Sequence, residues 1–532
     1  MNLADLVDEG IRKFGEYNAC YFEGKWYTNV ELNSTANRLG NALKSLGIRH
    51  GDRIVTQLPN CTEIFAAFTA TYRIGAVLVP MNPILRPDQI SYIYKDCGAA
   101  AVVTSSDYLP WIQEAQKEAP DLKHIILIDK DNIDGTLYLP KLISDCSDKL
   151  KSEDMENDDL AALIYTSGTT GNPKGVMHTH YSLWVNAVCF ADYQSLSGPT
   201  TLSGKSRHFD EKTYKPIEIE HQVTGPDRKI LSLACLPLSH SYGIAFANFG
   251  NLVGARSVMM RWWNPVEAMK LIEGMHINYM ALVPTMYVQV LDHPDLDKYD
   301  LSSLKYCISG AAALAAEVGR KWKEKVGVHI IEGWGMTESG ASTTGNNTFR
   351  PPKYGSIGVN MLRCNKVKIF DNDDREVPIG SSGELVIKGP AVMKGYWNLP
   401  EETNQSLKNG WLHTGDIGYV DEEGYFYITG RKKDLIIRGG ENVSPREVEE
   451  VVCKHPKVAE AGCVGVKDRV YGEEIKAFVV LKPGESCTEA EIIEHCKKSL
   501  PTFKMPKQVQ FIQALPKNIL GKTLRAELRK LG

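Results

Sequence analysis

The stretch DRIVTQLPNCTEIFAAFTATYRIGAVLVPMNP, residues 52–83, holds the pattern that predicts the fold. Two short apolar runs, at 52–59 and 76–83, flank a segment of helical periodicity at 62–75. Short apolar strands that alternate with helices are typical of a parallel sheet covered by helices. Similar runs recur as AAAVVTSS at 99–106, HIILID at 124–129 and INYMALVPT at 277–285. We therefore predict an α/β architecture.

The pattern changes twice further along the chain. From about residue 355, KVKIFDNDDREVP, GELVIKG and GYFYITG read as short strands between turns, which predicts a smaller antiparallel or barrel-like subdomain. After GRKKD, strand-like AGCVGV and IKAFVVL alternate with helical segments. Residues 433–532 carry 18 basic and 14 acidic residues, a net +4, against −8 for the rest. We predict two domains, 1–432 and 433–532.

Composition excludes several classes of protein. With 532 residues, of which 43% are hydrophobic, the chain is too long for a single core, and its net charge of −4 gives no global attraction to nucleic acid or anionic membranes. The twelve cysteines form no Cys-x-x-Cys pair, which favours reduced thiols over a zinc site. The longest apolar stretch, 66–85, contains Arg73 and two prolines. We expect a cytoplasmic protein without signal peptide, membrane span or nucleic-acid partner.

The strongest local motif is DLAALIYTSGTTGNPKGVMHTH, residues 159–180. An apolar strand leads into a loop that is rich in hydroxyls and glycines and ends at Lys174. Glycines let backbone N–H groups approach phosphate oxygens, hydroxyls donate to them, and the lysine supplies charge. The glycine spacing is not that of a Walker A loop. The pattern predicts a phosphate-binding loop.

A second motif, EGWGMTE at 332–338, follows a strand-like run. Trp334 between glycines offers a flat face for a base, while Thr337 and Glu338 offer a hydroxyl for phosphate and a carboxylate for Mg²⁺. The small residues Gly310-Ala311-Ala312 follow another such run and could lie against a purine.

Together these motifs resemble those of the adenylate-forming (AMP-binding) superfamily, which includes acyl-CoA synthetases, peptide-synthetase adenylation domains and luciferases. The resemblance covers essentially the whole chain. It implies a large N-terminal domain of two parallel-type α/β sheets with a small β-barrel-like subdomain, followed by a small mobile α+β domain. The activity it implies is activation of a carboxylic acid with ATP and Mg²⁺.

The resemblance also assigns a nucleotide site. Trp334 would stack on adenine, Thr337 would contact the α-phosphate and Glu338 would bind magnesium. Asp416, expected as an unpaired carboxylate before a turn, would accept the ribose hydroxyls, with Arg431 close by. The nucleotide-binding positions are Thr166, Ser167, Gly168, Thr169, Thr170, Lys174, Gly310, Ala311, Ala312, Glu332, Gly333, Trp334, Gly335, Met336, Thr337, Asp416, Ile428, Arg431 and Lys522.

Other positions match elements used in two half-reactions. Lys433 stands at the hinge position, and Gly439, Gly440 and Glu441 match a loop that lines the coenzyme A tunnel. Lys522, ahead of a basic helix, matches the lysine that reaches the carboxylate and α-phosphate during adenylation. The expected catalytic residues are Lys522, Glu338, Thr166 and His240.

The acyl pocket is predicted from the segment LACLPLSHSYG, residues 233–243, where His240 resembles a histidine that flanks the acyl group. The matching wall positions are His240, Tyr242, Val283, Thr285, Met286, Gly310, Gly335, Met336 and Gly340. They are mostly apolar and include no arginine, which favours an apolar monocarboxylate, a fatty or aryl acid, over a diacid. Residues 244–250 contain no aspartate, which argues against an amino-acid substrate.

These observations predict an acid–thiol ligase that forms acyl-AMP and then acyl-CoA, with ATP, Mg²⁺ and coenzyme A, as a monomer or homodimer. A stand-alone enzyme that loads the pantetheine of a carrier protein would share every motif, and a non-catalytic nucleotide-binding protein is a further alternative. The polar stretch 195–228 is expected to be a surface loop.

Overall fold

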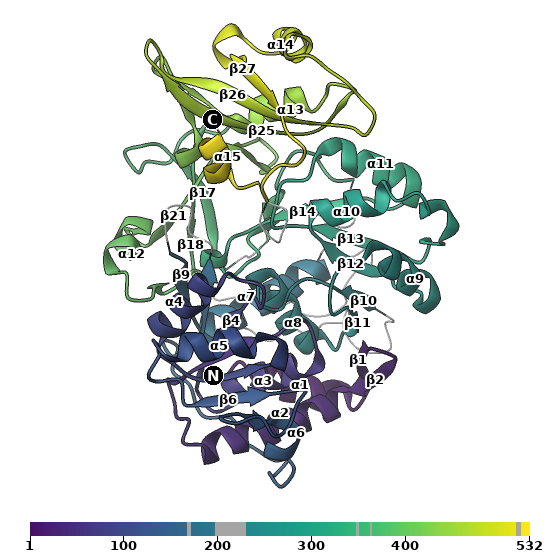
Figure 1. Cartoon of the computed structure of the whole chain (residues 1–532), viewed down its shortest axis with the longest axis vertical. Helices are drawn as coiled ribbons and strands as arrows, with labels where there is room; N and C mark the ends of the chain where they lie inside the picture. Colours follow the sequence, from purple (N-terminus) through teal and green to yellow (C-terminus); the bar gives the residue numbers. More distant parts are fainter. Residues whose placement is uncertain (167–171, 197–229, 347–350, 362–363, 518–522, 532) are drawn as a thin grey trace.

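The computed structural model describes residues 1–166, 172–196, 230–346, 351–361, 364–517 and 523–531. Four sheets organise it, and Figure 1 shows the first three in the lower and middle body with the fourth at the top. The runs at 52–59, 62–75 and 76–83 form β3 (Arg53–Gln57), α3 (Thr62–Arg73) and β4 (Val77–Met81). The predicted α/β class is therefore confirmed. The boundary between residues 432 and 433 stays a prediction.

The first sheet has nine strands. From β14 to β1 they are parallel, while β15, β16 and β2 add antiparallel edges, so the sheet is mixed. In spatial order the strands are β16 (Val359–Asn360), β15 (Thr344–Gly345), β14 (Ile330–Trp334), β13 (Tyr306–Ser309), β12 (Tyr279–Leu282), β10 (Leu231–Ala234), β11 (Arg256–Met259), β1 (Asn18–Phe22) and β2 (Lys25–Thr28). The helices of these segments are α1 (Asp5–Phe14), α8 (Ser241–Val253), α9 (Pro265–Met275), α10 (Pro284–Leu291) and α11 (Ala316–Val326).

The second sheet has eight strands, parallel except for β9 and β19 at one edge. In spatial order they are β19 (Gly395–Tyr396), β9 (Lys174–Thr179), β8 (Leu160–Thr166), β4, β3, β5 (Ala99–Thr104), β6 (His124–Leu127) and β7 (Leu137–Tyr138). Its helices are α2 (Asn29–Ser45), α3, α4 (Pro87–Cys97), α5 (Leu109–Gln116), α6 (Leu139–Leu142) and α7 (His180–Leu196). A capping box between Thr28 and Glu31 fixes the start of α2.

The third and fourth sheets follow the predicted changes of pattern. The third is antiparallel throughout: β17 (Lys366–Phe370), β18 (Gly383–Lys388), β21 (Trp411–Val420) and β20 (Leu407–Lys408), with β22 (Phe426–Arg431) on β21 and α12 (Pro400–Ser406) beside it. The fourth contains β24 (Glu441–Val443), β23 (Ile436–Arg438), β26 (Gly472–Leu481), β25 (Val458–Asp468) and β27 (Gln508–Phe511), with α13 (Pro445–Val452), α14 (Glu489–Lys497) and α15 (Arg525–Leu531). Single 3₁₀ turns are η1 (Ser106–Tyr108), η3 (Leu296–Lys298), η4 (Thr337–Ser339), η5 (Lys432–Asp434) and η6 (Thr502–Lys504).

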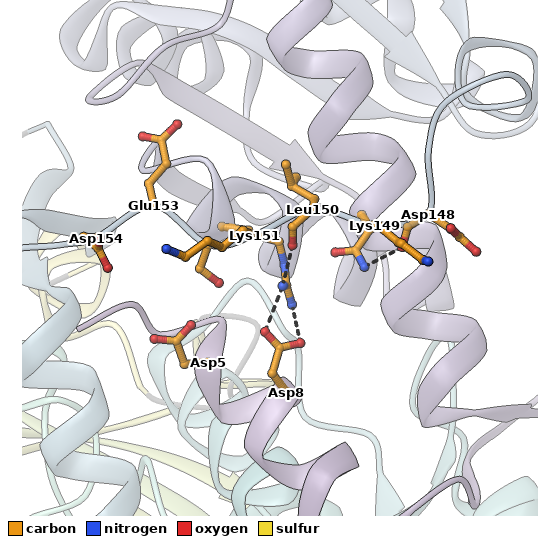
Figure 2. A pocket seen from close by; sticks show the side chains of 11 residues that line it. Asp5, Asp8, Asp148, Lys149, Leu150, Lys151, Glu153 and Asp154 are labelled. Carbon is orange, nitrogen blue, oxygen red and sulfur yellow. Dashed lines mark hydrogen bonds and ion pairs between the residues drawn. The ribbon is translucent and has the colours of Figure 1, made fainter.

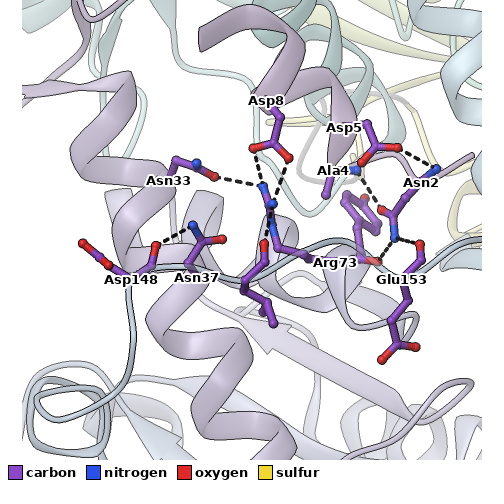
Figure 3. A network of polar contacts seen from close by, with 11 residues as sticks. Asn2, Ala4, Asp5, Asp8, Asn33, Asn37, Arg73, Asp148 and Glu153 are labelled. Carbon is purple, nitrogen blue, oxygen red and sulfur yellow. Dashed lines mark hydrogen bonds and ion pairs between the residues drawn. The ribbon is translucent and has the colours of Figure 1, made fainter. Parts of the chain in front are cut away.

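A buried arginine ties the N-terminal segment to the second sheet. Arg73, at the end of α3, has a side chain only 3% exposed and makes a bidentate ion pair with Asp8 of α1 at 2.8 and 2.9 Å. It also donates to Asn33 of α2 and to the carbonyl of Leu150, as Figure 3 shows. Because a buried charge is tolerated only when it is paired and hydrogen-bonded, these contacts fix α1, α2 and the 148–154 segment around one group.

Two further observations bear on the expectations from composition. All twelve cysteines are free thiols, and most of them are buried. Within the residues that the structure describes, no helix is both long and apolar enough to cross a bilayer.

Candidate functional site

Three of the predicted motifs meet at Thr337. The buried side chain of His178 on β9 lies with Nε2 2.6 Å from the carbonyl oxygen of Thr337 in η4. The hydroxyl of Thr337 lies 3.2 Å from that of Ser241, the first residue of α8 after His240. Burial lowers the pKa of His178 to about 4, so its ring is neutral at pH 7 and Nε2 donates to the carbonyl. The contacts join the second sheet, the 332–338 motif and the His240 element.

Glu338 and Lys174 meet through a residue that was not predicted. The hydroxyl of Tyr396 on β19 donates to Oε1 of Glu338 at 2.9 Å. The ammonium of Lys174, the first residue of β9, lies 5.1 Å from the centre of the Tyr396 ring. Thr166 ends β8 directly opposite Lys174 in the antiparallel ladder. Ser167, Gly168, Thr169 and Thr170 lie outside the described residues.

Asp416 is paired, so the expectation of an unpaired carboxylate before a turn was wrong. It lies within β21, 2% exposed, opposite Arg431 of β22, and the two side chains approach to 2.6 Å. The indole N–H of Trp334 donates to the other carboxylate oxygen at 3.1 Å. The antiparallel register brings these groups together. A carboxylate has about four acceptor positions, so the contacts with Arg431 and Trp334 leave at least one of them unused.

The aromatic of the second motif is held at its edge and packed on its sides. Trp334 contacts two apolar clusters, one of which includes Ile428. At Gly335 the chain passes so close to Ala341 that a Cβ would lie 1.7 Å from its carbonyl oxygen, so only glycine fits. Met336 and Gly333 flank this crossing and are half-buried.

Glu332 supports the loop where a purine was expected. Its Oε1 accepts the backbone N–H of Leu314 at 2.9 Å, just beyond Gly310-Ala311-Ala312. Burial raises the pKa of this carboxyl to about 7. Ala311 adopts a left-handed backbone conformation with φ of 66°. Glu332 thus acts on the loop through the backbone.

Most predicted acyl-pocket residues surround the start of α8 and α10. His240 caps α8 through Nδ1, which accepts the N–H of Tyr242 at 3.2 Å. The ring of Tyr242 faces Gly310, where an added Cβ would lie 3.0 Å from it. Val283, Thr285 and Met286 form the start of α10, and Gly340 follows η4.

An apolar cavity of about 210 Å³ lies next to this region, between α8 and the strands of the first sheet. None of the predicted wall positions lines it, although Gly243, the neighbour of Tyr242, does. Its wall includes Phe246, Ala247 and Gly250 on α8, and the Phe246 ring lies 5.1 Å from that of Tyr242. Among the residues that the structure describes, no charged side chain lines the cavity. Positions 243, 246, 247 and 250 share one face of α8, but the helix is apolar on most sides, so its sequence does not mark that face.

The C-terminal candidates lie in and after η5. Lys433 is exposed. Partial desolvation of its ammonium and the charge of Arg431 lower its pKa. Gly439 and Gly440, with φ of 61° and 91°, form a two-residue hairpin turn between β23 and β24, and Glu441 is exposed beside them. Lys522 and most of the 195–228 stretch lie outside the described residues.

A polar pocket of about 500 Å³ lies elsewhere, among α1, α2 and the 148–154 segment, as Figure 2 shows. Asp5, Asp8 and Arg73 line it, and none of the predicted site residues does. Its arginine is already neutralised by Asp8. This pocket belongs to the structural network around Arg73.

Comparisons with known proteins cover nearly the whole chain. A family profile described as AMP-binding enzyme matches residues 7–397, and one described as AMP-binding enzyme C-terminal domain matches 447–522. A long-chain-fatty-acid–CoA ligase of Bacillus subtilis is 33% identical over 555 aligned residues, which cover 99% of this chain and 94% of that protein.

Solved structures are similar over the full length. The anthranilate CoA ligase AuaEII in complex with anthranoyl-AMP matches with a TM-score of 0.88 at 28% identity, covering 100% of this chain and 97% of the other. ATP-bound MatB from Rhodopseudomonas palustris matches with a TM-score of 0.87 at 29% identity, covering 100% and 99%.

Proposed function

The chain belongs to the AMP-binding enzyme family, and we propose that it is an AMP-forming ligase that joins an apolar monocarboxylate, a fatty or aryl acid, to coenzyme A. The observation that carries the choice of acid is the cavity of about 210 Å³ beside α8, whose described lining residues carry no charge. Burial of hydrocarbon is favourable by about 0.8 kcal/mol per methylene group, whereas a second carboxylate would find no counter-ion among those lining residues.

In the proposed first half-reaction, a carboxylate oxygen attacks the α-phosphorus of ATP and the bond to the bridging oxygen breaks, which releases pyrophosphate. A carboxylate is a poor electrophile, and joining it to AMP supplies a good leaving group. The loop from Thr166 to Lys174 is proposed to hold the phosphates. The contacts of Thr337 with His178 and Ser241 support a fixed hydroxyl at the α-phosphate.

Glu338 is the residue proposed to hold the Mg²⁺ that accompanies ATP. Its Oε1 is bound by Tyr396, while Oε2 makes no hydrogen bond with any residue that the structure describes. A carboxylate oxygen is a preferred ligand of Mg²⁺, so the residue present fits the ion. When bound, the ion neutralises charge on the phosphate oxygens.

In the proposed second half-reaction, residues 433–532 rotate about Lys433, and the thiol sulfur of coenzyme A attacks the acyl carbon, so the carbon–oxygen bond to AMP breaks. Two half-reactions at one site need two different surfaces, which a moving domain supplies. The hairpin turn at Gly439 and Gly440 has no side chains to obstruct a pantetheine arm. Lys522 is proposed to act only in the first step.

A panel of carboxylates, scored for pyrophosphate release with and without coenzyme A, tests the proposal. Medium and long fatty acids or aryl acids should react faster than acetate, and coenzyme A should be consumed. Preference for a dicarboxylate or an amino acid would overturn the assignment of the acid. Transfer to a carrier protein in place of free coenzyme A would overturn the assignment of the acceptor.

A further inference from the structure

A short strand brings one tyrosine to the edge of the second sheet. β19 pairs antiparallel with β9, with Tyr396 opposite Val176, two residues beyond Lys174. From there the Tyr396 hydroxyl reaches Oε1 of Glu338 at 2.9 Å, and its ring lies 5.1 Å from the ammonium of Lys174. One side chain thus contacts a carboxylate from the first-sheet side and a cation from the second sheet.

Tyr396 is itself held on several sides. Its backbone N–H donates to the hydroxyl of Thr403 in α12 at 2.9 Å. The Tyr396 hydroxyl is the donor in its bond to Glu338, because an ionised carboxylate oxygen can only accept. The backbone of Glu338 is fixed nearby, because its carbonyl accepts the N–H of Met393 at 2.8 Å.

We propose that Tyr396 is a positioning residue that aims the free oxygen of Glu338 and the ammonium of Lys174 toward the same phosphate groups, and thereby sets the affinity for Mg²⁺ with ATP. The inference rests on the proposed function. A hydrogen bond to one oxygen of a metal-binding carboxylate restricts the direction of the other, and such partners change metal affinity by about 10- to 100-fold. The aromatic face holds the ammonium by a cation–π contact.

The test separates the hydroxyl from the ring. Tyr396→Phe removes the bond to Glu338 and keeps the face for Lys174, whereas Tyr396→Leu removes both. The measurement is equilibrium binding of ATP at increasing Mg²⁺. We expect Tyr396→Phe to raise the Mg²⁺ concentration at half-maximal binding by about 10-fold, and Tyr396→Leu to weaken ATP binding at saturating Mg²⁺ as well. Tyr427→Phe, which loses a comparable hydroxyl bond to Asp421, is the matched control and should leave the Mg²⁺ requirement unchanged.

A double-mutant cycle decides whether Tyr396 acts through Glu338. If it does, adding Tyr396→Phe to Glu338→Gln changes the Mg²⁺ requirement no further. Additive effects, or a Mg²⁺ requirement for Tyr396→Phe equal to that of the control, would overturn the proposal. If Tyr396→Phe lowers the melting temperature markedly, Thr403→Val replaces it, because it removes the acceptor of the Tyr396 N–H. A shift of the Mg²⁺ requirement in the same direction supports the role, and no shift overturns it. Wild-type protein that binds no ATP would instead refute the proposed function.

Discussion

Glu332→Gln should stabilise the protein in a pH-dependent way. The Glu332 carboxyl is 5% exposed, and burial raises its pKa to about 7 from an ordinary value near 4.5. A group whose folded pKa lies above its unfolded pKa contributes stability that is fully present below the unfolded value and is lost as pH rises through the folded value. The wild type therefore loses stability between pH 4.5 and 7, and the glutamine variant does not.

The size of the effect follows from the two pKa values. At 1.36 kcal/mol per pH unit, the difference between about 7 and 4.5 corresponds to about 3 kcal/mol at pH 8. A unit of about 430 residues unfolds with an entropy near 0.9 kcal/mol/K, so the melting temperature should rise by about 4 °C. Glutamine keeps an oxygen that can accept the N–H of Leu314, so ATP affinity should stay close to that of wild type.

Differential scanning calorimetry of wild type and Glu332→Gln from pH 5 to 8 measures this. The control is Glu384→Gln, because folding lowers the pKa of Glu384 whereas it raises the pKa of Glu332. Burial acts to raise the pKa of Glu384, but the N–H of Gly415, the ring of His413 and the charge of Lys432 lower it overall. Its contribution to stability is present above the unfolded pKa near 4.5, so Glu384→Gln should destabilise by nearly the same amount throughout pH 5 to 8. A Glu332→Gln variant whose stability relative to wild type does not increase with pH would refute the reasoning.

Three other predictions concern the site. Lys522→Ala should abolish acyl-AMP formation yet spare thioester formation from supplied acyl-AMP, and equal loss of both steps would refute its assigned role. In the wild type, kcat/KM should rise about fourfold per methylene group of the acid until the cavity is full. Ala247→Phe fills part of the cavity, so the preferred acid should be shorter. An unchanged dependence of kcat/KM on chain length would show that the acyl chain lies elsewhere. Burial lowers the pKa of His178 to about 4 from an ordinary value of 6.5. Neutral His178 therefore adds to the free energy of unfolding above pH 6.5, and acidification removes up to about 3 kcal/mol of it. In urea unfolding, the free energy of unfolding should fall less on acidification for His178→Gln than for the wild type, and an equal fall would contradict this.

Local pattern predicted the elements well, because it depends on neighbours in sequence. The run at 124–129 became β6, and the run at 277–285 became β12 and the start of α10. Residues 366–378, read as strand and turn, became β17 and the loop after it. Each of these segments carries its own alternation or capping signal, so tertiary contacts did not need to be known.

The contacts that complete the site are non-local and could not be read in this way. A pair between Asp416 and Arg431 can be considered from the sequence, but sequence spacing does not give the register that sets the two residues opposite each other within a ladder. Tyr396 reaches Glu338 only because a two-residue strand pairs with β9, more than 200 residues earlier in the chain. The apolar cavity depends on which face of α8 meets the first sheet. Because the helix is apolar on most sides, its sequence does not indicate which face that is.

Helix α8 runs from the polar site at its first residue to the apolar cavity one to two turns later, so polar contacts and hydrocarbon burial act at different places along it. Its first residue, Ser241, contacts Thr337 in the polar site, while Phe246 and Ala247, one to two turns later, line the cavity. Hydrocarbon in the cavity is bound equally before and during attack on ATP, so a longer chain should lower KM and leave kcat unchanged. The contacts proposed for Glu338 and Lys174 would act on the phosphates, where charge changes in the transition state, so their loss should lower kcat. If chain length changed kcat in place of KM, and loss of the Glu338 and Lys174 contacts changed KM in place of kcat, the acid would not extend along α8.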